Sequence, residues 1–317
     1  MSNEDLSIRH RTAPPAERPR GVWLAPVKGV FNSPFEKWAN PFEEDLFDIT
    51  LSPGIQWRST TVDDRERITD WFDFYRDAFS KDQRERIIWA DTVLRAFEPD
   101  FIDQMVGIHG RVIAFTLALS LKTSAPLASQ VLRFEMEESA EGRLLPHSGS
   151  REAETIHLPR WPLQQQLGRS QLDEMPPVYA AVWRVFEQPV DHGLRRCLGA
   201  YRFAIASKGF VDAVPILACS ALEALSATHK SGKVIDRVAR YSSSGDAAAR
   251  LARLYRVRHW FVHGADIPEM RDEQARLNVI QDGLRLVKEI ILSALQDKNL
   301  FDAGKAGPRA VMAYLVE

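Results

Sequence analysis

The sequence is poor in cysteine and has no long apolar run, and both absences exclude classes of protein. Only Cys197 and Cys219 occur in 317 residues, which excludes a disulfide-stapled secreted domain. We expect both to be small core residues in a reducing cytoplasm. The longest nearly unbroken apolar run, Val112 to Leu121, is about half of the roughly 20 residues that a spanning helix needs. We therefore expect a cytoplasmic protein without a membrane segment.

The chain also lacks the overall basic charge of many nucleic-acid-binding proteins. Its formal net charge is −2 and its pI about 6.5, so any surface for nucleic acid must be local. Serine hydrolase, Rossmann, P-loop and kinase signatures are absent as well. A hydrophobic content of 45% with 26% charged residues is typical of a globular chain. The length suggests two domains of about 100–200 residues each.

The N-terminal half shows few regular patterns. Residues 1–20 are polar and rich in proline, without the apolar core of a signal peptide, and predict a flexible leader. Dense proline and aromatic residues over 21–61 indicate irregular structure, and helical spacing follows over 63–80 and 81–97. Short strands are expected at 131–135 and 154–158.

We interpret residues 21–170 as a mixed, mostly helical N-terminal domain with a few short strands, which would sense an unknown ligand or protein. An apolar segment over 101–121 is ambiguous, because Gly107 and Gly110 are candidate helix breaks within it.

Residues 171–300 predict a helical bundle of four or five helices, so the fold class is mainly α. Val214 to Leu225 is apolar almost all round, which is typical of a buried central helix. A helix from about 246 to 263 ends at Gly264, a good residue for a helix C-terminus. Asp266 and Pro268 are start signals for a long final helix. Residues 301–317 would be a tail, with a short strand over 310–315.

Two charged residues interrupt these apolar helix faces. Arg258 falls on the stripe made by Leu254, Tyr255 and Phe261, and Glu223 lies inside the apolar run of the central helix. A charge in such a place is costly unless it is paired or meets a charged ligand. Glu223 therefore pairs with Arg258 in our interpretation and aims it, while a purely structural ion pair remains the alternative.

His263 follows Arg258 after four intervening residues, and helical geometry constrains how the two can meet. Five residues place them about 140° apart on a regular helix. They converge if the helix ends or distorts at His263, which Gly264 permits, or if a symmetric interface completes the site. Arg256 with His263, and Arg151 with His157, fit a looser spacing; we interpret the latter as noise.

The segment LYRVRHWFVHG, residues 254–264, resembles the signature helix of HEPN-domain proteins, in which Arg, a polar residue, three mostly apolar residues and His end a helix. The helix with Leu222 to Leu225 and the long final helix are similar to the Apea-like branch. The resemblance covers about residues 175–300. His259 stands where the family often has Asn.

This resemblance implies a metal-independent endoribonuclease without cofactor, active as a homodimer in which two Arg/His sets meet. Such proteins are often linked to anti-phage or stress-triggered RNA cleavage, with a fused domain restraining the nuclease. RNA supplies its own nucleophile, the 2′-hydroxyl. His263 would be the general acid/base, Arg258 the phosphate clamp, His259 a polar assistant and Glu223 a supporting residue. Products would carry a 2′,3′-cyclic phosphate or its hydrolysed form.

Local charge agrees with an RNA partner. Between Lys230 and Arg258 lie eight basic residues against two acidic ones, which suits a phosphate backbone. The candidate RNA-binding residues are Lys230, Lys233, Arg237, Arg240, Arg253 and Arg256. The alternative is a solvated helix face paired with the acidic segment 63–103.

Two further interpretations stay open. His259 and His263 share a helix face and suit a metal, with Asp266 or a distant residue as third ligand. The bundle can also be a non-catalytic HEPN-type module for RNA binding, protein interaction or dimerisation. The other histidines, His10, His109, His147, His192 and His229, are expected to be surface or satisfied core residues.

Overall fold

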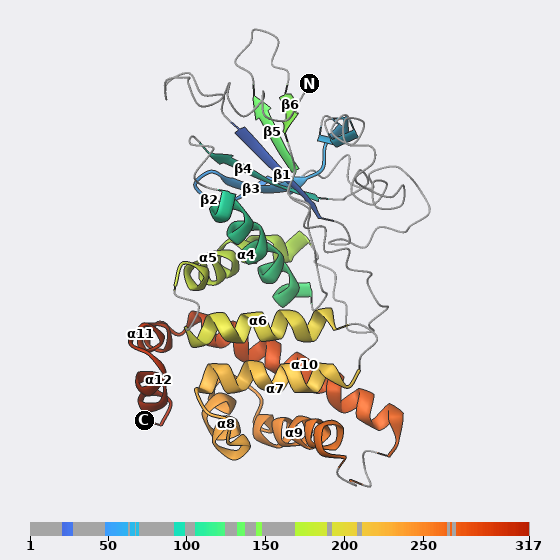
Figure 1. Cartoon of the computed structure of the whole chain (residues 1–317), viewed down its shortest axis with the longest axis vertical. Helices are drawn as coiled ribbons and strands as arrows, with labels where there is room; N and C mark the ends of the chain where they lie inside the picture. The colour runs from blue at the N-terminus through green and yellow to red at the C-terminus, as the bar shows by residue number, and fades with distance from the viewer. Residues whose placement is uncertain are drawn as a thin grey trace, which may run out of the picture. The chain divides into compact units, whose positions relative to one another are not determined.

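The computed structural model describes the larger part of the chain, and that part is mainly α-helical (Figure 1). The described residues are 21–27, 48–62, 64–66, 68–69, 92–98, 105–123, 132–136, 144–147, 169–188, 192–207, 211–264, 267 and 271–316. Among them, no helix has both the length and the apolar character needed to cross a membrane.

The chain divides into two compact units. Unit 1 is Met1–Val112 with Ser129–Glu154, and unit 2 is Ile113–Ala128 with Thr155–Glu317. The boundary falls inside α4 (Met105–Thr123), which runs as one helix through Gly107 and Gly110. Residues 301–317, expected as a tail, belong to unit 2.

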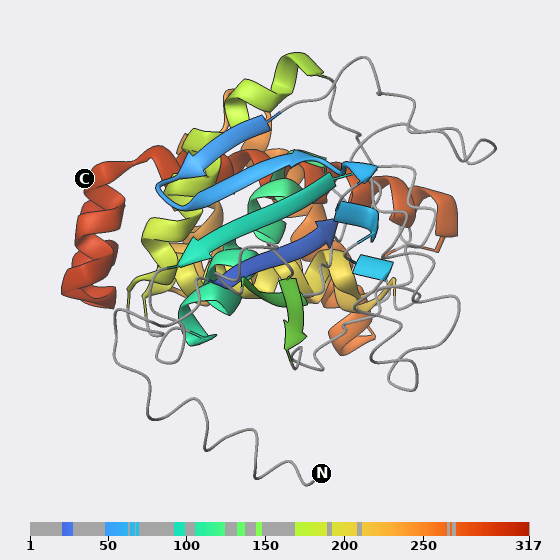
Figure 2. The same cartoon turned by 90° about the horizontal axis from the view of Figure 1, so that it is seen from above.

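Unit 1 is built on an antiparallel sheet with the strand order β2-β3-β4-β1-β5-β6 (Figure 2). β1 pairs with β4 and β5, strands that follow it far along the chain. The strands are β1 (Gly21–Val27), β2 (Asp48–Ser52), β3 (Ile55–Ser59), β4 (Thr92–Glu98), β5 (Leu132–Met136) and β6 (Leu144–His147).

The sheet corrects two expectations for the N-terminal half. β1, β2 and β3 lie in the segment 21–61 that was expected to be irregular, and β4 replaces the end of the helix expected over 81–97. Strand pairing satisfies backbone groups across the sheet, and this long-range gain overrides the local pattern. The strand expected at 131–135 is confirmed within one residue by β5. Helical residues at 64–66 and 68–69 agree with the helix expected over 63–80, whereas the strand expected at 154–158 lies outside the described residues.

Unit 2 is a set of packed helices in which α7 is central (Figure 1). α7 contacts α6, α8, α9 and α10. Its apolar residues are buried almost all round, including Val214, Ala218, Cys219 and Leu222, as expected for a helix without a polar face. The bounds are η3 (Arg169–Glu174), α5 (Met175–Phe186), α6 (Gly193–Ala206), α7 (Ala213–Ser226), α8 (Ser231–Val238), η4 (Ala239–Tyr241), α9 (Ala247–His263), α10 (Glu273–Gln296), α11 (Lys298–Ala306) and α12 (Pro308–Tyr314).

The C-terminal end of unit 2 differs from expectation in two respects. α10 begins at Glu273, where Asp272 accepts a hydrogen bond from the backbone N–H of Ala275, rather than near Asp266 and Pro268, which lie outside the described residues. The strand expected over 310–315 is wrong, because residues 310–314 lie in α12. Pro308 opens that helix, where its missing N–H costs nothing.

Candidate functional site

α9 brings the Arg-x4-His segment to the end of a regular helix. Gly264 stops it with a φ of 62°, and its N–H donates to the carbonyl of Trp260. Gly264 adopts this left-handed conformation at little cost because it has no Cβ. The expected helix end is therefore confirmed. The helix stays regular through His263, so it does not bend His263 toward Arg258.

Arg258 and Glu223 form the ion pair that the sequence predicts. Arg258 Nη1 lies 2.8 Å from Glu223 Oε1 across the contact between α9 and α7. The Glu223 side chain is 9% exposed and that of Arg258 25% exposed. The Nε–H of Arg258 is buried and has no acceptor in the described part of the chain. Glu223 thus holds the guanidinium through Nη1, while a quarter of the Arg258 side chain stays exposed.

A third group, His229, shares the same carboxylate. Its Nδ1 lies 3.3 Å from Glu223 Oε2, while its side chain is 92% exposed. The two oxygens of Glu223 therefore serve one residue each, Arg258 and His229. From the sequence, His229 is expected to be a surface or satisfied core residue with no role in the site. The contact depends on the turn after α7, where Ala227 has a φ of 52° and returns the chain toward Glu223.

His259 and His263 lie together on the exposed side of α9. Their rings stack with centroids 5.3 Å apart and an interplanar angle of 29°, and both residues are exposed. No hydrogen bond or ion pair joins either one to Arg258, all three being within the described residues. Arg258 and the two motif histidines therefore do not form one cluster within a single chain.

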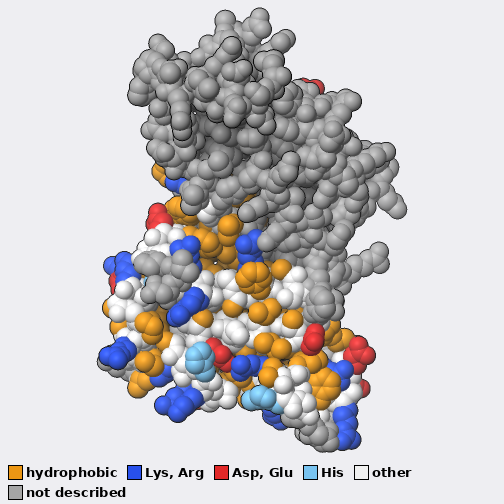
Figure 3. All heavy atoms as spheres, in the orientation of Figure 1, with side chains coloured by type: hydrophobic (Ala, Val, Ile, Leu, Met, Phe, Trp, Pro, Cys, Tyr) orange, Lys and Arg blue, Asp and Glu red, His pale blue; other side chains and the backbone are white. Residues whose placement is uncertain are grey.

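Five of the expected RNA-binding side chains lie at the surface of unit 2. In the part of the chain that the structure describes, none of them forms an ion pair. They are Lys230, Lys233, Arg240, Arg253 and Arg256. Figure 3 shows basic and histidine side chains next to one another on the face of α8 and α9.

Arg237 differs from this set. It is buried, and its Nη1 donates to the carbonyl of Ser226 at 2.9 Å, where it satisfies a group that the end of α7 leaves unpaired. Arg250, a further basic residue of the segment, is also paired, with Asp282. The exposed cations are thus a smaller set than the sequence count suggests.

The side chains behind Glu223 are buried and uncharged. Burial raises the pKa of the Cys219 thiol and of the Tyr255 hydroxyl well above their usual ranges; in both, Glu223 adds to the rise and Arg258 opposes it. Tyr255 donates its hydroxyl proton to the carbonyl of Cys219. Both cysteines of the chain are free and buried, as expected. These groups stay neutral near pH 7 and form the apolar wall against which the ion pair rests.

The described residues contain no group of three or more His, Cys, Asp and Glu side chains arranged to hold a metal ion. His259 and His263 lie close together as the metal interpretation requires, but Asp266 lies outside the described residues.

Comparisons with protein-family models, with curated proteins and with solved structures find no match for this chain.

Proposed function

We propose that the chain is a metal-independent endoribonuclease, an effector of a defence or stress response, whose site is built around Arg258. The observation that carries the proposal is the ion pair between Glu223 and Arg258. A carboxylate that is 9% exposed fixes the guanidinium beside a surface that carries unpaired cations. A fixed and partly exposed guanidinium is suited to a phosphate, since its planar fork matches phosphate oxygens.

The chemistry follows from these groups. The 2′-hydroxyl of RNA attacks the neighbouring phosphorus, so the protein has to move protons and stabilise charge on the phosphate oxygens. Arg258 supplies the charge. His263 is exposed at the end of α9 and acts as general acid/base, and His259 stacks on it as a polar neighbour. The exposed cations of α8 and α9 hold the RNA backbone.

The proposal includes a homodimer. Within one chain, Arg258 faces Glu223 on α7 while His263 lies on the exposed side of α9. A two-fold axis near the end of α9 brings the Arg258 of one protomer to the His263 of its partner. The half-exposed Val262, with 47% of its surface accessible, suits burial in such an interface.

The test is cleavage of tRNA, rRNA and mRNA by the purified chain in EDTA, with mapping of the cut ends. His263→Ala removes an exposed side chain, so we expect loss of cleavage with an unchanged melting temperature.

Arg258→Lys keeps the charge that Glu223 needs but loses the planar fork, and we expect a decrease of about 10²-fold or more in kcat. Arg258→Ala is a poorer probe, because it leaves a buried carboxylate without its partner and destabilises the fold.

Lys305→Gln is the control, since Lys305 lies on α11 and contacts Asp302 and Phe301. Cleavage that disappears with chelator, or that survives in His263→Ala, contradicts the proposal.

One observation favours a second function, a non-catalytic module that binds RNA or protein. Glu223 already neutralises Arg258 in the chain as it stands, as a purely structural ion pair would. Such a module shifts RNA in a gel at low salt without cutting it. Arg253→Ala and Arg256→Ala then weaken binding, whereas His263→Ala leaves binding unchanged.

A further inference from the structure

The proposed reaction needs two proton transfers. The Arg-x4-His segment of α9 supplies two neighbouring histidines for them, His259 and His263. One group takes the proton of the 2′-hydroxyl and another gives a proton to the leaving 5′-oxygen. His259 and His263 stack against each other on the exposed side of α9 and contact neither Arg258 nor Glu223. Within one chain, a third histidine shares the Glu223 carboxylate with Arg258, the proposed phosphate clamp.

That imidazole is His229. An oxygen of the carboxylate that pairs with Arg258 can only accept, so in its contact with Glu223 Oε2 we assign His229 the donor role, through Nδ1–H. This hydrogen bond fixes the tautomer and leaves the lone pair of Nε2 on the far side of the ring. The ring itself is 92% exposed, so Nε2 is open to a large substrate. A carboxylate that orients an imidazole in this way is a recurring arrangement for a general base.

The backbone that carries His229 is held in an unfavourable conformation. Ala227 has a φ of 52°, and in the described residues it is the sole non-glycine residue with positive φ. The N–H groups of Ala227 and Thr228 both donate to the carbonyl of Glu223. The turn therefore ties the segment before α8 to Glu223 at a cost that an alanine usually avoids.

We propose that His229 is the general base of the site and acts beside Arg258 of its own chain, an inference that rests on the proposed nuclease function. Nε2 of His229 takes the proton of the 2′-hydroxyl as the 2′-oxygen bonds to phosphorus. The bond from phosphorus to the 5′-oxygen breaks, and the protonated His263 of the second protomer gives its proton to that oxygen. No other reactant is consumed. Glu223 is a positioning residue that serves the clamp and the base together.

The experiment compares wild-type chain with His229→Asn in EDTA, on an RNA that the wild type cleaves. Asparagine keeps a donor near the Nδ1 position but cannot accept a proton. We expect kcat to decrease by about 10²- to 10⁴-fold with little change in KM. The acidic limb of the pH–rate profile, which reports deprotonation of the base, flattens. The melting temperature stays unchanged because the side chain is exposed.

A matched control and a rescue separate catalysis from structure. His147→Asn makes the same chemical change at the end of β6 in unit 1, and its kcat and pH profile stay those of the wild type. Free imidazole restores part of the activity of His229→Ala, which a purely structural role would not allow.

The two proposals fail in different ways. If wild type cleaves while His229→Asn keeps its kcat and its acidic limb, His229 is not the base, although the nuclease function stands. If the wild type cleaves no RNA in EDTA, the nuclease function falls and this inference falls with it.

Discussion

At the scale of single residues, Ala227 sets the direction that the chain takes after the central helix, α7. An L-residue in the left-handed region costs about 1–2 kcal/mol, because its Cβ approaches a carbonyl oxygen. Its φ of 52° nevertheless persists, since the Glu223 carbonyl accepts from the N–H groups of Ala227 and Thr228. Strain of this kind beside a charged cluster is a physical reason to connect the turn with function.

Ala227→Gly therefore stabilises unit 2, by about 1 kcal/mol, because glycine enters the left-handed region without a Cβ contact. Urea unfolding followed at the helices of unit 2 by hydrogen exchange measures the change. Ala180→Gly is the matched control. Ala180 is exposed inside α5, so the same substitution there loses about 1 kcal/mol. A loss of stability in both variants contradicts the prediction.

The residues in and around the site differ in how far the sequence reveals them. Glu223 and Arg258 are charges on otherwise apolar helix faces, so their pairing follows from periodicity and the cost of burying charge. His229 lies outside a helix, next to a turn that its local sequence does not announce. Arg237 counts as one more cation in the sequence, whereas its contact with Ser226 exists only once α8 packs beside α7.

At the scale of elements, α11 attaches the C-terminal end of the chain to the other helices of unit 2. His192 caps α6 by accepting from the N–H of Leu194, and its Nε2 lies 3.2 Å from the carbonyl of Phe301 on α11. The guanidinium of Arg184 lies 4.2 Å from the centre of the Phe301 ring. α11 is thus held by α5 and α6 together, through a buried histidine and a cation on an aromatic face.

Gly304 permits this close approach, and Gly304→Ala disrupts it. A Cβ at Gly304 would lie 2.3 Å from Nε2 of the buried His192. We expect a loss of about 1–3 kcal/mol from overpacking, although alanine normally favours a helix over glycine. Circular dichroism during thermal unfolding provides the measurement. Gly199→Ala in α6, where nothing lies within 4 Å of the new Cβ, gains about 1 kcal/mol. Equal effects of the two substitutions would exclude the close contact.

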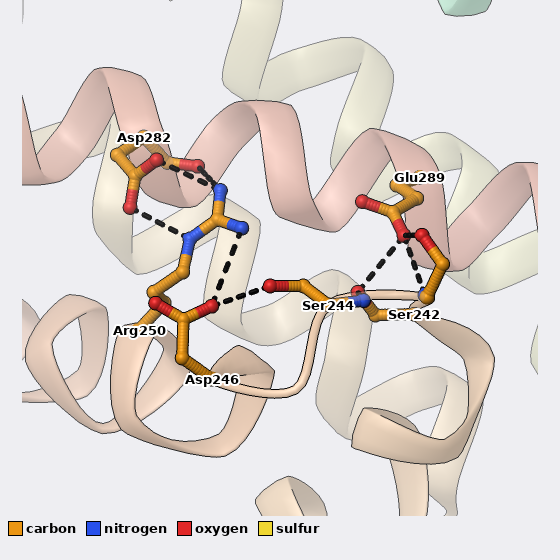
Figure 4. A network of polar contacts seen from close by, with 7 residues as sticks. Ser242, Ser244, Asp246, Arg250, Asp282 and Glu289 are labelled. Atoms are coloured by element: carbon orange, nitrogen blue, oxygen red, sulfur yellow. Dashed lines mark hydrogen bonds and ion pairs between the residues drawn. The ribbon is translucent and has the colours of Figure 1, made fainter.

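At the scale of the whole molecule, unit 2 depends on carboxylates that accept several hydrogen bonds each. Glu289 accepts from the Ser242 and Ser243 hydroxyls and the Ser243 N–H, beside the paired Arg250 (Figure 4). Asp297 accepts from the Tyr241 and Tyr314 hydroxyls and caps α11 through two backbone N–H groups. Burial alone would raise both pKa values, but these hydrogen bonds together lower the pKa of each carboxyl.

Both carboxyls have a lower pKa in the folded state than in the unfolded chain. The stability that they contribute is therefore fully present above their unfolded pKa values. It is lost as the pH falls through the folded values. The contribution of these two carboxyls is therefore constant from pH 7 to about 5 and decreases below about pH 4. Hydrogen exchange of the amides of α10 and α11 across this range tests it. Asp297→Asn reduces the pH dependence, whereas Asp302→Asn, at a side chain with 52% of its surface exposed, does not. A profile of Asp297→Asn that follows the wild type refutes the prediction.

The sequence by itself determined most of the helices of unit 2 and the charged pair between two of them. A helix repeats every 3.6 residues and its ends depend on nearby groups, so the apolar run of α7 and the stop at Gly264 are local signals. The exceptions, α11 and α12, are short and lack a stripe long enough to identify.

Only the tertiary structure decided the sheet, the turn at Ala227 and the place of His229. Gly21 on β1 pairs with Glu98 and with Glu135, and no local pattern specifies partners so far apart along the chain. The contact of His229 with Glu223 likewise requires the left-handed turn and the packing of α8. Both arise from the free energy of the whole fold, which outweighs the preference of any single segment.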